Sequence, residues 1–97
     1  MQILTEAAAN ATLAVTYVEP KKAVYLYYRS KGSKLIRMTK KDGQWGGTKQ
    51  MRTAQGNVGA TSQLAVVHSN NINHVFWVAE NDPDNEPIHF RDTKLDD

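Results

Sequence analysis

An imperfect internal repeat limits the folds that this chain can adopt. Leu13-Ala14-Val15 recurs 51 positions later as Leu64-Ala65-Val66, and Val24-Tyr25 meets Val75-Phe76 at the same offset. A period of about 45–50 residues with four short strands per unit is typical of β-propeller blades. The sequence therefore predicts two copies of one small antiparallel sheet.

Short runs of β-branched and aromatic residues alternate with turn residues along the chain. Turns are expected at Glu19-Pro-Lys-Lys22, Ser30–Ser33 and Asp42-Gly43, because Gly, Pro, Asp and Ser interrupt strands there. No segment predicts a stable helix. The sequence therefore indicates an all-β fold, with strands expected at residues 2–7, 12–18, 23–29, 34–40, 44–51, 62–68, 73–79 and 87–92.

The repeat also divides the chain, which at 97 residues is expected to be a single domain, 1–97. Residues 12–61 form the first predicted blade and residues 62–97 a second, incomplete one. Residues 1–11 are expected to supply an outer strand that completes a neighbouring blade, and the second blade would take such a strand from another chain. Two blades cannot close a ring, so we expect a homo-oligomer, with a trimer of six blades favoured over two or four chains.

Composition excludes several classes of protein. The chain has no cysteine, so it has neither disulfides nor thiolate metal sites. No apolar run approaches the ~18 residues of a membrane span. The segment Met1–Glu6 lacks the features of a signal peptide, and the compartment is left open, cytoplasmic or non-classically secreted.

Charge is distributed unevenly. Lys21 to Arg52 contains ten of the twelve basic residues and one acid, a net +9, whereas Glu80 to Asp97 contains seven acids and two basic residues, a net −5. Two interpretations remain open: solvated surfaces, or a basic half that faces the acidic tail of another copy. The basic residues are spread over several strands without a nucleic-acid-binding motif, so nucleic acid is not expected as a partner.

The residues do not indicate an enzyme, a metal site or a cofactor. The spacing of His68, His74 and His89 matches no zinc pattern, and the sequence places no carboxylate partner beside them. Neither a Ser/His/Asp set nor a phosphate-binding glycine loop is present. We therefore predict a protein without catalytic residues.

Three segments carry a family resemblance: Val24-Tyr-Leu-Tyr-Tyr28, Leu35-Ile-Arg37 and Gly43-Gln-Trp45-Gly46. Together they resemble the blade motif of the fucose-specific lectin family, six-bladed propellers of fungi and some bacteria whose small members have two blades per chain. The resemblance implies a sugar site between blades, where an Arg and a Glu bind hydroxyls and a Trp stacks on the sugar. Those positions hold Tyr25, Arg37 and Trp45 here.

In the second unit the resemblance places Phe76 and Phe90 at the Arg and Glu positions, and the Trp position lies beyond the chain. Two functions follow as hypotheses. The first is a lectin-like propeller that binds fucose or another neutral sugar at Trp45, Arg37 and Tyr25. The alternative is a structural or protein-interaction propeller whose sugar site has decayed. An aromatic platform beside polar donors is how proteins grip a pyranose, which favours Trp45 as the centre of any such site.

Overall fold

The computed structural model describes residues 12–52, 58–59, 62–78 and 87–96. The outer strand expected within residues 1–11 lies outside the described residues. Among the described residues, no helix is long and apolar enough to cross a membrane.

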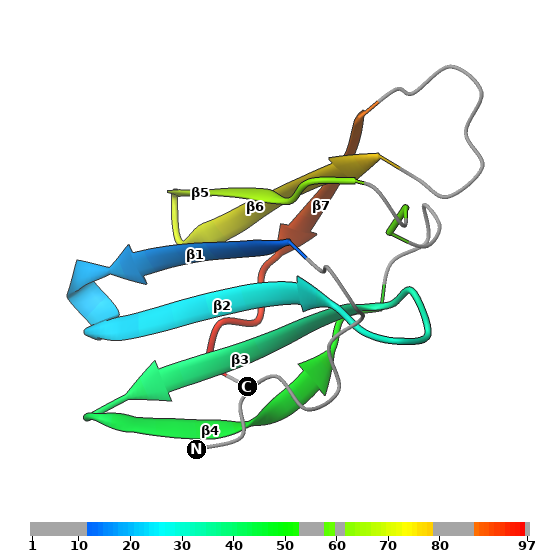
Figure 1. The fold of residues 1–97 in the computed structure, drawn as a ribbon. Helices are drawn as coiled ribbons and strands as arrows, with labels where there is room; N and C mark the ends of the chain where they lie inside the picture. The colour runs from blue at the N-terminus through cyan, green and yellow to red at the C-terminus, as the bar shows by residue number, and fades with distance from the viewer. Residues whose placement is uncertain (1–11, 53–57, 60–61, 79–86, 97) are drawn as a thin grey trace.

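The chain forms two antiparallel sheets (Figure 1), so the predicted all-β class is confirmed. In each sheet consecutive strands pair as hairpins. A short 3-10 turn, η1 (Glu19–Lys21), joins the first two strands. The four-stranded sheet contains β1 (Leu13–Val18), β2 (Ala23–Arg29), β3 (Leu35–Lys41) and β4 (Gln44–Gln50), and the three-stranded sheet contains β5 (Ala65–Ser69), β6 (Ile72–Val78) and β7 (Pro87–Asp92).

Turn residues with positive φ set the hairpins. Asp42 and Gly43 connect β3 to β4 with φ of 55° and 79°, and Asn70 and Asn71 connect β5 to β6 with φ of 54° and 64°. Two-residue hairpin loops with both φ values positive match the right-handed twist of the strands, and Asn, Asp and Gly tolerate this conformation best. The sequence signal at Asp42-Gly43 therefore identified a real hairpin.

The two sheets pack face to face, with β1 beside β5 (Figure 1). We call the facing surfaces the inner faces and the opposite surfaces the outer faces. Burial alternates along β1, β6 and β2 as far as Tyr27, because successive side chains of a strand point to opposite faces. The inner faces form one hydrophobic core, which includes Ala14, Val18, Ala23, Tyr25, Tyr27, Leu35, Val75 and Trp77.

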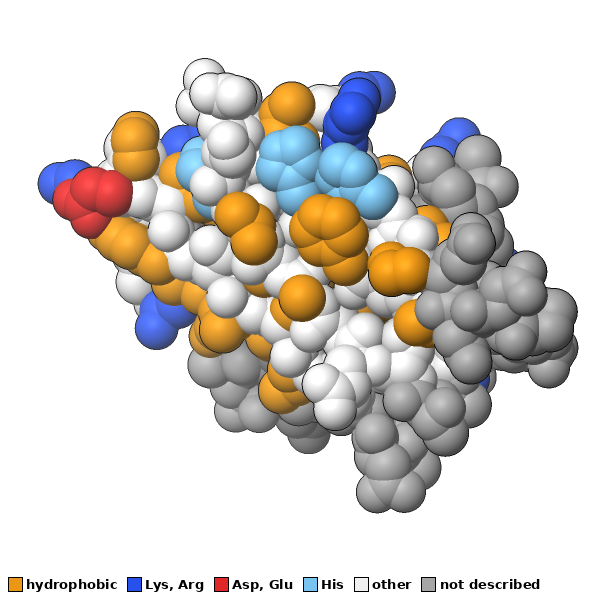
Figure 2. Space-filling view, turned by 90° about the horizontal axis from the view of Figure 1, so that it is seen from above, with side chains coloured by type: hydrophobic (Ala, Val, Ile, Leu, Met, Phe, Trp, Pro, Cys, Tyr) orange, Lys and Arg blue, Asp and Glu red, His pale blue; other side chains and the backbone are white. Residues whose placement is uncertain are grey.

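The outer faces keep apolar side chains in contact with solvent, and Figure 2 shows hydrophobic side chains beside histidines at the surface. On the four-stranded sheet, Leu13, Val15 and Tyr17 are 48%, 60% and 54% exposed. On the three-stranded sheet Val67 is 57% exposed and pairs with His74 of β6. Adjacent apolar side chains left in water on a sheet face commonly mark an interaction surface.

The structure changes how the second strands of the two repeat units align. The connection between β1 and β2 has four residues, whereas that between β5 and β6 has two, Asn70 and Asn71. Ala14 pairs with Tyr27, and its counterpart Ala65 pairs with Phe76. Phe76 therefore occupies the position of Tyr27, not of Tyr25, and the alignment of Val24-Tyr25 with Val75-Phe76 was wrong by two residues.

Counterpart residues of the two sheets lie on opposite kinds of face. Tyr27 belongs to an inner face, and its counterpart Phe76 belongs to an outer face. The inner face of the four-stranded sheet thus corresponds to the outer face of the three-stranded sheet. Equivalent faces of the two sheets therefore point in the same direction, so the sheets stack in the same sense.

Candidate functional site

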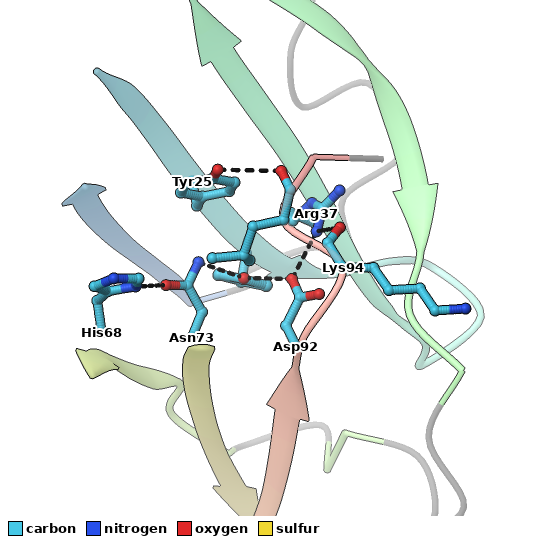
Figure 3. Close-up of polar contacts among 8 residues, drawn as sticks. Tyr25, Arg37, His68, Asn73, Asp92 and Lys94 are labelled. Atoms are coloured by element: carbon cyan, nitrogen blue, oxygen red, sulfur yellow. Dashed lines mark hydrogen bonds and ion pairs between the residues drawn. The ribbon is translucent and has the colours of Figure 1, made fainter. Parts of the chain in front are cut away.

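A buried ion pair links the two sheets (Figure 3). The Arg37 side chain of β3 and the Asp92 side chain of β7 are 1% and 4% exposed. Arg37 Nη1 donates to Asp92 Oδ2 at 2.8 Å and to the Lys94 backbone oxygen at 3.2 Å. Charge-assisted bonds of this length are strong, so they fix the guanidinium in place between the sheets.

The ion pair continues into a chain of hydrogen bonds that ends at a half-buried histidine (Figure 3). The Tyr27 hydroxyl donates to Asp92 Oδ2 at 2.7 Å and accepts from Asn73 Nδ2 at 2.9 Å. The Asn73 oxygen lies 2.8 Å from His68 Nδ1. Burial, and then the hydrogen bond with Asp92, raises the pKa of Tyr27, so the residue stays a neutral phenol at physiological pH.

Tyr25 is 1% exposed and its hydroxyl donates to the Leu95 backbone oxygen at 3.1 Å. The Arg37 guanidinium carbon lies 5.7 Å from the centre of the Tyr25 ring, a cation–π distance. Two residues predicted to bind sugar are thus in contact with each other. Both also bind the segment that follows β7.

Trp45 is the second residue of β4 and pairs with Lys40, which places it on the outer face. The Lys40 ammonium lies 5.9 Å from the ring centre, and the ring packs against a buried cluster of Tyr28, Ile36 and Met38. A surface cavity of about 320 Å³ lies at this end of the sheet. Tyr25 and Trp45 both line it, together with Thr39, Lys41, Gln44, Gly46, Leu95 and Asp96. The structure therefore brings Tyr25 and Trp45 to one cavity, and Arg37 does not line it.

In the three-stranded sheet the register gives His74 and His89 as counterparts of Tyr25 and Arg37. The expected positions, Phe76 and Phe90, were therefore wrong. His74 Nδ1 lies 2.8 Å from His89 Nε2, and the His89 ring stacks on Phe76 at 4.7 Å between ring centres. Burial, followed by the nearby charges of His74 and Arg91, lowers the pKa of His89, so the His89 ring favours its neutral form at physiological pH.

Sequence reasoning missed Asp92 and Asn73 as members of the polar site. Both stand at inward positions of strands that are otherwise apolar on that side. A polar residue in an inward register is the signal that indicates a buried hydrogen-bond network, because burial without partners would be costly. Among the described residues, no group of three or more His, Cys, Asp or Glu side chains could hold a metal ion.

The chain matches no protein-family model, no curated protein and no solved structure. The fold and the site therefore define its class, an all-β protein of two stacked antiparallel sheets joined by a buried polar network.

Proposed function

We propose that this chain is a non-enzymatic interaction protein whose two sheets act as neighbouring blades of a propeller-like ring closed by further copies of the chain. The observation that carries the proposal is that a face covered in one sheet is equivalent to a face left exposed in the other. Leu13 is 48% exposed, whereas its counterpart Leu64 is 9% exposed. Tyr27 is fully buried between the sheets, and its counterpart Phe76 lies on an outer face.

A second copy stacked in the same sense would cover one outer face of each copy, and further copies would cover the remaining two. The three-stranded outer face of one copy would contact the four-stranded outer face of the next, repeating the packing within each chain. Such an interface is heterologous, and it forms a ring when the rotation closes. Three copies would give six sheets, the number that the lectin resemblance implies.

The proposal predicts the behaviour of two surface variants, Val15→Arg and Val67→Arg. Each places a charge on one outer face at a position more than half exposed, so the fold should tolerate it. Light scattering should find an oligomer for the wild type, about three times the chain mass for a six-sheet ring, and monomers for each variant alone. An equimolar mixture should give heterodimers, because each variant retains the face that the other lacks.

Lys31→Glu, a charge change in the exposed β2–β3 loop, is the control and should leave the oligomer intact. A monomeric wild type at concentrations of tens of micromolar would refute the assembly. Dimers formed by either variant alone would show a like-to-like interface and would refute the head-to-tail arrangement.

Carbohydrate binding is the second candidate function. The cavity of about 320 Å³ beside Trp45 favours it, because Thr39, Gln44 and Asp96 add hydrogen-bonding groups to an aromatic wall. Arg37 contributes to this candidate only by holding Tyr25 in position, since its guanidinium is engaged by Asp92.

Titration calorimetry against fucosides and other neutral monosaccharides checks this candidate. We expect weak binding by the wild type and at least about a tenfold loss of affinity in Trp45→Ala and in Gln44→Ala, each about 1.4 kcal/mol. Oligomers of unchanged mass would show that the variants lost the sugar and not the fold. If no neutral sugar binds, the lectin hypothesis is wrong, and the assembly proposal is not affected.

A further inference from the structure

A cleft lies between the two sheets, next to the buried ion pair. Its volume is about 450 Å³, and it opens between the end of β4 and the end of β7. Met51 and Phe90 give it two apolar walls. The residues that line it are Arg37, Lys49, Met51, Arg52, Phe90, Arg91, Asp92, Thr93 and Lys94.

Positive charge dominates this cleft. Five of the residues that line it are basic and one is acidic, Asp92. That carboxylate already accepts hydrogen bonds from Arg37 and Tyr27, at 2.8 and 2.7 Å. Arg52, Arg91 and Lys94 are exposed at the mouth, so the cleft has a surplus of cationic groups in contact with solvent. A concave surface lined by charge of one sign concentrates counter-ions.

The cleft is also built on a fixed base. Arg37 is held by Asp92 and by the Lys94 backbone oxygen, so the segment after β7 cannot move away without breaking that contact. Figure 3 shows the Lys94 side chain extending away from this contact, while its backbone oxygen stays on Arg37. The exposed cationic residues at the mouth therefore surround a floor that is fixed by hydrogen bonds.

We propose that this cleft binds a compact oxyanion, a phosphate or sulfate ester, with Arg52 and Lys94 as its principal ligands. Arginine suits such groups because its planar guanidinium can donate two parallel hydrogen bonds to the oxygens. The apolar walls of Met51 and Phe90 would contact the organic part of the ester. The volume falls within the range of small-molecule sites. A small ester fits better than a nucleic acid, because the cations surround one hollow and do not form a stripe. This inference does not depend on the assembly of the chain.

Calorimetric titration of the full chain tests the inference with three probes: galactose 6-sulfate, galactose 6-phosphate and galactose. We expect both esters to bind in the cleft and galactose not to bind there. The ester that binds with the higher affinity identifies the preferred anion. Raising the salt from about 0.05 M to about 0.5 M should weaken the binding several-fold, because exposed charges are then screened.

The double variant Arg52→Gln/Lys94→Gln should lower the association constant for the esters at least about tenfold. Both positions are exposed, so the variant should keep its melting temperature. The matched control is Lys22→Gln/Lys31→Gln, which removes the same charge from exposed positions that do not line the cleft, and it should bind as the wild type does.

Equal losses in the two double variants would mean a general effect of net charge and would overturn the site. No ester binding by the wild type would overturn it as well. Binding only to long polyanions, such as single-stranded DNA, would replace the small ester with a nucleic acid. The wild-type oligomer mass, measured on the same sample, reports on the assembly separately.

Discussion

Replacing Asp92 with alanine is expected to destabilise the fold by about 3–5 kcal/mol, because removing one partner of a buried ion pair leaves the other charge desolvated. The variant also deprives the buried Tyr27 hydroxyl of its acceptor. Folded domains are stable by only about 5–15 kcal/mol, so the loss would remove a large share of the total. Urea denaturation followed by Trp fluorescence measures it.

The control is Asp96→Ala. Asp96 forms the other described ion pair, with Lys21 at 3.0 Å, but its side chain is 73% exposed and water screens the interaction. The lowered pKa of Asp96, caused by Lys21, does not change this expectation. If Asp92→Ala unfolded at nearly the same urea concentration as Asp96→Ala, the buried network would not be what joins the sheets.

Replacing Trp77 with alanine is expected to cost about 3–5 kcal/mol, the usual range for a large aromatic side chain removed from a core. Trp77 is 2% exposed and belongs to the core between the sheets, with its ring 6.4 Å from that of Phe90. Thermal and urea unfolding measure the change. Trp77→Phe should recover most of the loss, since the indole nitrogen makes no hydrogen bond to the described residues.

Trp45→Ala serves as the comparison for Trp77→Ala. Trp45 is half-buried at the edge of its sheet, and its removal should cost clearly less stability. Equal losses for the two variants would indicate that Trp45 is as structural as Trp77. That result would also weaken Trp45 as a ligand-binding residue.

Sequence patterns predicted the described strands but not the buried polar network between the sheets, for physical reasons. The β-branched and aromatic runs, and turns such as Asp42-Gly43, act locally, and the structure places strands where those runs occur. Partners such as Arg37 and Asp92 are brought together only when the sheets stack, and nothing in the local pattern of either strand specifies that contact.

Register shows the same limit. The repeat suggested that Phe76 matches Tyr25, because sequence similarity cannot tell a four-residue connection from a two-residue one. A shift of two keeps each side chain on its face but changes its neighbours along the strand. The counterpart of Tyr25 is therefore His74, two residues from Phe76, and the counterpart of Arg37 is His89, one residue from Phe90.

The way the strands are joined also sets an order of events during folding. Among the described strands, every pair joins neighbours in the chain, whereas the bond between Arg37 and Asp92 spans 55 residues and that between Tyr27 and Asn73 spans 46. Contacts close in sequence form rapidly, because little chain entropy is lost in closing a short loop. The hairpins should therefore already be formed in the folding transition state, and the two sheets should dock after it. Interactions that form after the transition state act on the unfolding rate, so the polar network would determine how long the native state persists and not how quickly it is reached.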